Sequence, residues 1–207
     1  MKNIILIIFA VCFSTTIYAQ EAKNQETLFN KKVDLTKIGF MVSPGFNFTE
    51  IAGESATFYQ LKAGVVFWDK LTIGGYYSEA INDVRPANLL VDYPRANIEM
   101  SAAGGFIEYS LYTNKLLHLT IPVAIGSMEM EGDDYNPQDI NEGESRTMYV
   151  EPAVQAEVNL HKYVRLHAGL GYRIMGDPNY SEGIIPRADD ALSFQVGLKF
   201  GLFQIKK

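Results

Sequence analysis

The chain has 207 residues, of which 47% are apolar and 20% charged, with 18 Lys and Arg against 24 Asp and Glu. This length fits one domain or two very small ones, and the net charge of −6 argues against a nucleic-acid-binding protein, which needs a basic surface. The apolar content excludes a disordered chain, and a single cysteine excludes a disulfide-rich fold.

The first 19 residues have the order of a secretory signal peptide: a charge, an apolar run and a small residue at the cleavage site. Lys2 precedes an apolar run too short to span a bilayer, and cleavage is expected after Ala19. A lipid anchor on Cys12 is disfavoured because Val11 is bulky where a small residue is needed. We therefore expect residues 1–19 to be removed on export, 20–37 to form a flexible periplasmic tail, and 38–207 to form the folded domain.

After the signal peptide, no apolar run approaches the ~18 residues that a membrane-spanning helix needs. Apolar residues instead alternate with polar or small ones, which is the period of a β-strand. Eight segments show this alternation, namely residues 38–46, 59–67, 71–78, 103–111, 117–126, 148–159, 164–174 and 192–202.

A soluble β-sandwich would alternate as well, with its apolar face inward. Here the other face is rich in Gly and carries isolated charges at strand centres, and short connections alternate with long polar ones. Both features are typical of bacterial outer-membrane barrels. The fold prediction is all-β: a single eight-stranded antiparallel up-and-down transmembrane β-barrel with short periplasmic turns and long outer loops, surrounded by outer-membrane lipid. The charges expected to pair as a lumen charge network are Lys62, Glu108, Glu151, Glu157, Arg165, Arg173 and Lys199.

Matching apolar to apolar positions across each hairpin predicts three-residue turns at 68–70, 113–115 and 160–162. The last of these pairs Asn159 with Tyr163 and sets Glu157 opposite Arg165. Eight strands enclose just enough room for side chains, so the lumen is expected to be filled and not to conduct ions. Replacing Gln195 by Glu is expected to be mild, because that position faces the lumen.

The segments expected at the outer end (49–55, 79–99, 127–146 and 175–190) hold 17 acidic residues against four arginines. The most acidic is the outer loop 127–146, with Glu129, Glu131, Asp133, Asp134, Asp139, Glu142 and Glu144. The plain interpretation is that these carboxylates solvate exposed loops. The alternative is weak binding of divalent cations or a cationic partner, without the fixed spacing of an EF-hand.

Four segments resemble a family of small, uncharacterised Bacteroidetes-type outer-membrane barrels: Leu117–Gly126 (LHLTIPVAIG), Val150–Asn159 (VEPAVQAEVN), Tyr163–Arg173 (YVRLHAGLGYR) and Val196–Phe203 (VGLKFGLF). The junction Tyr18-Ala19-Gln20 is also similar to the cleavage site of that group. The resemblance implies the fold and the outer membrane, and it implies no reaction.

No Gly-rich phosphate loop, HExxH or cysteine-based metal motif occurs in the sequence, so we expect neither a cofactor nor a resident metal. His118 and His167 fall on the lumen face, near Glu108 and Glu157. No lipid-facing strand position is His, Ser, Asp or Glu, so we expect a structural or surface-interaction protein and not an enzyme. Two alternatives stay open: a lipid-modifying hydrolase or acyltransferase that uses one of these histidines, and an exported soluble ligand-binding barrel with an apolar interior.

Overall fold

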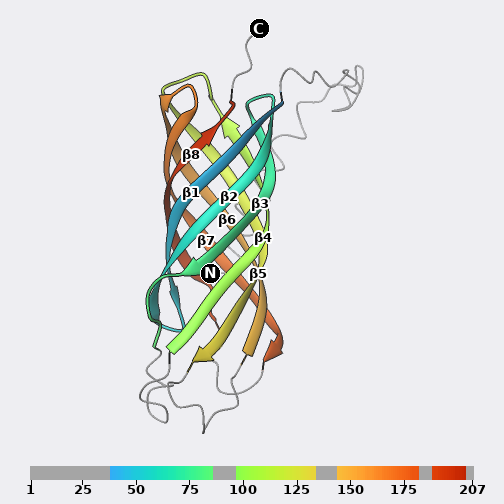
Figure 1. Ribbon diagram of the computed structural model, residues 1–207, viewed down its shortest axis with the longest axis vertical. Coiled ribbons are helices and arrows are strands. Elements are labelled where there is room, and N and C mark those ends of the chain that lie inside the picture. The colour runs from blue at the N-terminus through green and yellow to red at the C-terminus, as the bar shows by residue number, and fades with distance from the viewer. Residues whose placement is uncertain (1–37, 86–96, 134–143, 182–187, 204–207) are drawn as a thin grey trace, which may run out of the picture. The chain divides into compact units, whose positions relative to one another are not determined.

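The computed structural model describes residues 38–85, 97–133, 144–181 and 188–203, all within one compact unit, Leu35–Lys207 (Figure 1). The expected signal peptide and periplasmic tail lie outside the described residues. Among the described residues, no helix is long and apolar enough to cross a membrane.

Eight antiparallel strands follow one another in chain order and close into a barrel. Their bounds are β1 Ile38–Ile51, β2 Glu54–Phe67, β3 Leu71–Ala80, β4 Asn97–Leu111, β5 Leu117–Asp133, β6 Glu144–His161, β7 Val164–Ser181 and β8 Ala191–Gly201. Pairing of β1 with β8, from Met41 opposite Gly201 to Phe48 opposite Phe194, closes the ring. The predicted fold class is therefore confirmed.

The barrel has two different ends (Figure 1). One end, called the turn end here, holds the connections β2–β3, β4–β5 and β6–β7, the start of β1 and the end of β8. The other, called the loop end, holds the two-residue β1–β2 turn and the longer connections. In the β1–β2 turn Ala52 and Gly53 both have positive φ, as a two-residue hairpin requires.

The polarity of the barrel is inside out. Apolar side chains such as Phe40, Ile107 and Leu170 are exposed on the outer face, whereas Lys62 and Glu157 are buried in the lumen. The outer face is therefore suited to lipid. This arrangement overturns the alternative of a soluble barrel with an apolar interior.

The lumen is layered along its length. Ile51, Ile98, Met100, Met128 and Met130 lie buried near the loop end, at the strand positions closest to it. Two residues of the connections, Val84 and Ala188, are buried in the same apolar cluster. The charged lumen residues lie further toward the turn end.

One predicted turn is confirmed and two are wrong. Phe67 lies opposite Leu71, which leaves the expected three-residue turn 68–70. The β4–β5 connection is longer than predicted and runs from 112 to 116, because Lys115 N bonds to Tyr112 O in a β-turn and Leu116 O accepts from Asn159 N on β6.

The predicted pairing of Asn159 with Tyr163 is also wrong, because Asn159 lies opposite Arg165 and Glu157 opposite His167. An irregularity between Asn159 and His161 inserts one residue, so that a two-residue connection still preserves the faces of both strands.

The predicted outer loops are too long. Strands β5, β6 and β7 have 17, 18 and 18 residues, and they continue through much of 127–146 and 175–190. Glu129, Glu131 and Asp133 belong to β5 and Glu144 to β6, whereas the predicted loop residues Asp134, Asp139 and Glu142 lie outside the described residues. The pattern of apolar residues outward is reversed here, with Met128 and Met130 inward and Glu129 and Glu131 outward, because an outward side chain beyond the lipid contacts water and no longer needs to be apolar.

Candidate functional site: a charged network in the lumen

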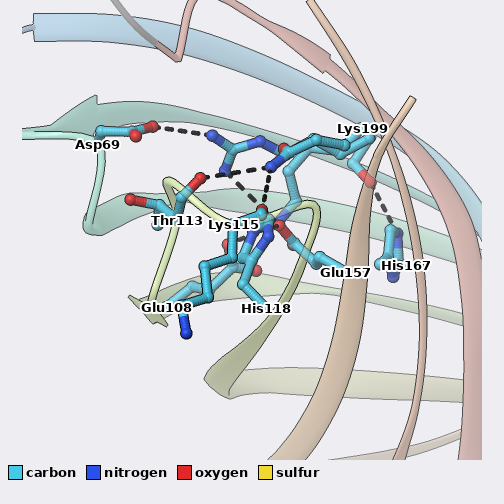
Figure 2. A network of polar contacts seen from close by, with 11 residues as sticks. Asp69, Glu108, Thr113, Lys115, His118, Glu157, His167 and Lys199 are labelled. Carbon is cyan, nitrogen blue, oxygen red and sulfur yellow. Dashed lines mark hydrogen bonds and ion pairs between the residues drawn. The ribbon is translucent and has the colours of Figure 1, made fainter. Parts of the chain in front are cut away.

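Lys199 on β8 is the centre of a charged group near the turn end, called the turn-end cluster, which consists of Glu108, His118, Glu157, Arg165, Lys199 and Asp69. Figure 2 shows how Asp69, Glu108, His118, Glu157 and Lys199 lie in it. Its Nζ lies 2.5 Å from Glu108 Oε1 on β4 and also contacts Glu157 Oε1 on β6. In a ring of eight strands β4 and β8 are diametrically opposite, so the Glu108–Lys199 ion pair crosses the lumen.

Glu157 joins three further partners to this cluster. Its Oε2 lies 2.9 Å from His118 Nε2 and 3.6 Å from Arg165 Nη1. Arg165 Nη2 in turn donates to Asp69 Oδ1 at 2.8 Å, which ties the β2–β3 turn to β7. The predicted partners Glu157 and Arg165 are thus in contact, but diagonally and not in the opposite positions that the sequence indicated.

A second group, the central cluster, surrounds Glu151 on β6. The Oε2 atom of Glu151 accepts from Arg173 Nε at 2.7 Å. Its Oε1 atom accepts from Asn47 Nδ2 at 3.0 Å, Ser193 Oγ at 2.8 Å and Gln195 Nε2 at 2.6 Å. A buried carboxylate with four donors is well satisfied, and charge-assisted bonds of this kind are the stronger ones.

Gln195 extends the central cluster across the barrel. Its Oε1 accepts from Lys62 Nζ on β2 at 3.2 Å and from Gln155 Nε2 at 2.7 Å. The guanidinium of Arg173 lies over the rings of Phe58 and Tyr149, at 5.3 and 4.8 Å from their centres. These contacts fill the middle of the lumen with side chains from β1, β2, β6, β7 and β8.

All seven residues proposed for the lumen charge network face inward and are at most 5% exposed. The structure divides them into two clusters, with Lys62 joined to the central one through Gln195. Asp69 supplies a fourth carboxylate, so four basic and four acidic side chains meet in or at the lumen. This balance matters because an unpaired charge in such an interior costs several kcal/mol.

The predicted network omits the uncharged partners Asn47, Gln155, Ser193 and Gln195 and the carboxylate of Asp69. Asp69 lies in the predicted turn 68–70, and nothing in the alternation reveals that a turn residue engages a lumen arginine. Asn47 and Gln195 have the lumen parity of their strands, so their side chains could have been nominated as partners for the buried charges.

The two lumen histidines have different partners. His118 contacts Glu157, as described, and His167 Nε2 lies 3.1 Å from Ser43 Oγ. Ser43 and His167 are 3% and 5% exposed, so the pair is closed off from lipid. Within the described residues, His167 Nδ1 has no hydrogen-bonding partner, so the pair lacks the carboxylate that orients the base in a hydrolase triad.

Outward-facing carboxylates gather near the loop end, where Glu79, Glu99, Glu129 and Glu131 help to line a surface cavity of about 270 Å³. We call these four residues the acidic face. Glu99 lies directly opposite Glu131 on the neighbouring strand, and Glu129 pairs with Arg146. In the part of the chain that the structure describes, no group of three or more His, Cys, Asp or Glu is arranged to hold a metal ion.

No family model matches this chain, and no curated protein sequence matches it. Its structure is similar to that of Neisserial surface protein A, with a TM-score of 0.57 and 12% identity over 79% of this chain and 96% of that one. It is also similar to a major outer membrane protein from Thermus thermophilus, with a TM-score of 0.58 and 10% identity over 79% of this chain and 99% of that one. Fold and inside-out polarity together are those of a small outer-membrane β-barrel.

Proposed function

We propose that the protein is an integral outer-membrane barrel that does not conduct ions and acts through its loop end, in a structural or surface-interaction role. The observation that supports the closed lumen most directly is the Glu108–Lys199 ion pair between opposite strands. Ion flow would require the turn-end and central clusters to separate, which would leave buried charges without partners.

Conductance in planar bilayers tests this proposal. The refolded protein is expected to give no large, steady currents, whereas the variant Glu108→Ala/Lys199→Ala, which removes the diametral pair, is expected to conduct more. Insertion of both proteins is checked by protection from added protease. Large, steady currents from the inserted unmodified barrel would overturn the proposal.

We further propose that the acidic face binds divalent cations weakly. Directly opposed like charges on neighbouring strands, such as Glu99 and Glu131, repel each other. A cation that bridges them would relieve this repulsion, but carboxylates without a preformed geometry bind with a Kd no tighter than ~10⁻⁴–10⁻³ M. Calcium titration of the barrel and of Glu99→Gln/Glu131→Gln tests this, and equal heats from both proteins would contradict it.

A catalytic role is the weaker candidate, because both lumen histidines are buried and the Ser43–His167 pair has no access to lipid. Phospholipase and acyltransferase assays on the refolded protein test it, with His118→Gln and His167→Gln as controls.

We also propose, from the four strand segments that carry the resemblance, that the chain belongs with the small Bacteroidetes-type barrels.

A further inference from the structure

Each of the three short turns at the turn end places an exposed aromatic ring beside a lysine. The β2–β3 turn has Trp68 and Lys70, the β4–β5 turn has Tyr112 and Lys115, and the β6–β7 turn has Lys162 and Tyr163. Two of these lysines lie over the ring of their own turn, at 5.7 Å from Tyr112 and 4.8 Å from Tyr163. We call these six residues the turn-end collar.

Two rings of the collar are held in an unfavourable backbone conformation. Trp68 has φ 54° and Tyr112 has φ 58°, in the left-handed region that bulky residues rarely occupy. Asn or Gly would adopt the same positive φ with a smaller conformational free-energy cost. Strained backbone of this kind clusters at active sites and ligand-binding sites, and here both strained residues carry exposed rings at the end of the barrel.

Hydrogen bonds fix each turn of the collar to a neighbouring strand. Lys70 O accepts from Ser110 N at 2.7 Å, and Tyr163 O accepts from Gly201 N at 3.0 Å. The β4–β5 turn is held by Asn159 Nδ2, which donates to Lys115 O at 2.7 Å. The aromatic rings and ammonium groups are therefore carried on a rigid support before any ligand binds, which lowers the entropic cost of binding.

Charge is separated between the two ends of the barrel. The acid within the collar turns, Asp69, is engaged inward by Arg165. Among the described residues, the three lysines of the collar have no acidic partner. At the other end the acidic face points outward.

The length of β4 gives the position of the collar relative to the bilayer. Tyr109 and Glu99 are ten residues apart along β4, which is about 33 Å of strand. At a strand tilt of about 40° this length spans about 25 Å along the barrel axis, which is the height of the apolar band of an outer-membrane barrel. Tyr109 lies opposite Leu71, which follows Lys70 of the collar, so the collar begins at the edge of this band and lies at headgroup depth.

We propose that the turn-end collar binds anionic glycerophospholipid headgroups, one at each turn, with the lysine on the phosphate and the aromatic ring against the glycerol region. This inference rests on the proposed membrane insertion. Lysine is a good donor to phosphate, and an aromatic ring is favoured at the boundary between lipid and water. The collar would hold the turn end in the leaflet that faces it.

Trp68 is the only tryptophan of the chain and reports on its own binding site. The barrel is refolded into phosphatidylcholine vesicles that contain spin-labelled phosphatidylglycerol or spin-labelled phosphatidylcholine, and quenching of Trp68 fluorescence is compared. Labelled phosphatidylglycerol is expected to bind more strongly by about five-fold per lysine, and 0.5 M salt is expected to weaken this preference.

Variants separate the lysine from general effects. Lys70→Gln is expected to remove most of the preference at Trp68, Lys70→Arg to keep it, and Arg85→Gln, with the same loss of charge at the loop end, to leave it unchanged. Equal quenching by the two lipids, or a preference that survives Lys70→Gln, would overturn the inference while leaving insertion intact. Absence of quenching by either lipid would overturn insertion and the inference together.

Discussion

The guanidinium carbon of Arg165 lies 3.8 Å from the centre of the Phe203 ring, at the turn end of the lumen. The same guanidinium contacts Asp69 and Glu157, so that two carboxylates and one aromatic face surround it. Phe203 follows β8 and is only 5% exposed. Phe203 thus covers the turn-end cluster with an apolar ring.

Replacing Phe203 by Leu is expected to lower the free energy of unfolding by about 1 kcal/mol, because the apolar volume is largely kept while the cation–π contact with Arg165 is lost. Phe203→Ala is expected to cost about 3 kcal/mol, since it also empties the site. Urea unfolding of the refolded barrel measures both. Equal stability of Phe203→Leu and the unmodified protein would show that the stacking contributes nothing.

The substitution Glu157→Gln is expected to cost about 3–5 kcal/mol, because Lys199 and Arg165 lose a buried counter-charge. The matched control is Glu99→Gln on the acidic face, where removal of a like charge opposite Glu131 is expected to be neutral or to stabilise by about 0.2–1 kcal/mol. Unfolding midpoints at low salt compare the two variants. A similar effect of both would mean that burial of the ion pairs carries no energetic weight.

The contacts of Gln195 reverse the expectation that Gln195→Glu is mild. Gln195 Nε2 donates to Glu151 Oε1 at 2.6 Å, so a second carboxylate there would face the first and remove its donor. A loss of about 1–3 kcal/mol is expected. The double variant Gln195→Glu/Glu151→Gln exchanges the two groups, so that only one carboxylate is present. It is expected to recover part of the lost stability, and a double-mutant cycle measures the coupling. Strict additivity of the two changes would contradict this coupling.

Substitution by Ala is expected to have opposite effects on stability at two glycines, Gly126 and Gly105. A Cβ on Gly126 would lie 2.0 Å from the hydroxyl of Tyr76, which donates to Tyr149 at 2.7 Å. Gly126→Ala is therefore expected to displace Tyr76 and cost about 1–3 kcal/mol. A Cβ on Gly105 would meet only Gly74 O at 3.6 Å, so Gly105→Ala is expected to stabilise the strand by about 0.5–1 kcal/mol. Urea midpoints that rank the two variants the other way would refute this.

Much of this architecture follows from the period of the sequence. In β8, Phe194, Leu198 and Phe200 alternate with Gln195 and Lys199, and a strand has only two faces, so the pattern alone separates lipid-facing from lumen-facing residues. The same parity identified every buried charge of the lumen. Near the loop end the parity is reversed, because Glu129 and Glu131 lie on an outer face that has left the lipid while Met128 and Met130 fill the lumen.

The partners of the buried charges were decided only by the closed barrel. Parity assigns Glu108 and Lys199 to the lumen but says nothing of their heights, and their contact depends on the closure that sets β4 opposite β8. Because of a one-residue irregularity between Asn159 and His161, the residue opposite Glu157 in the strand pairing is His167 and not Arg165. The long side chain of Arg165 still reaches Glu157 diagonally. Local alternation selects a face, whereas register and ring closure select the neighbour, because both depend on hydrogen bonds between strands far apart in the chain.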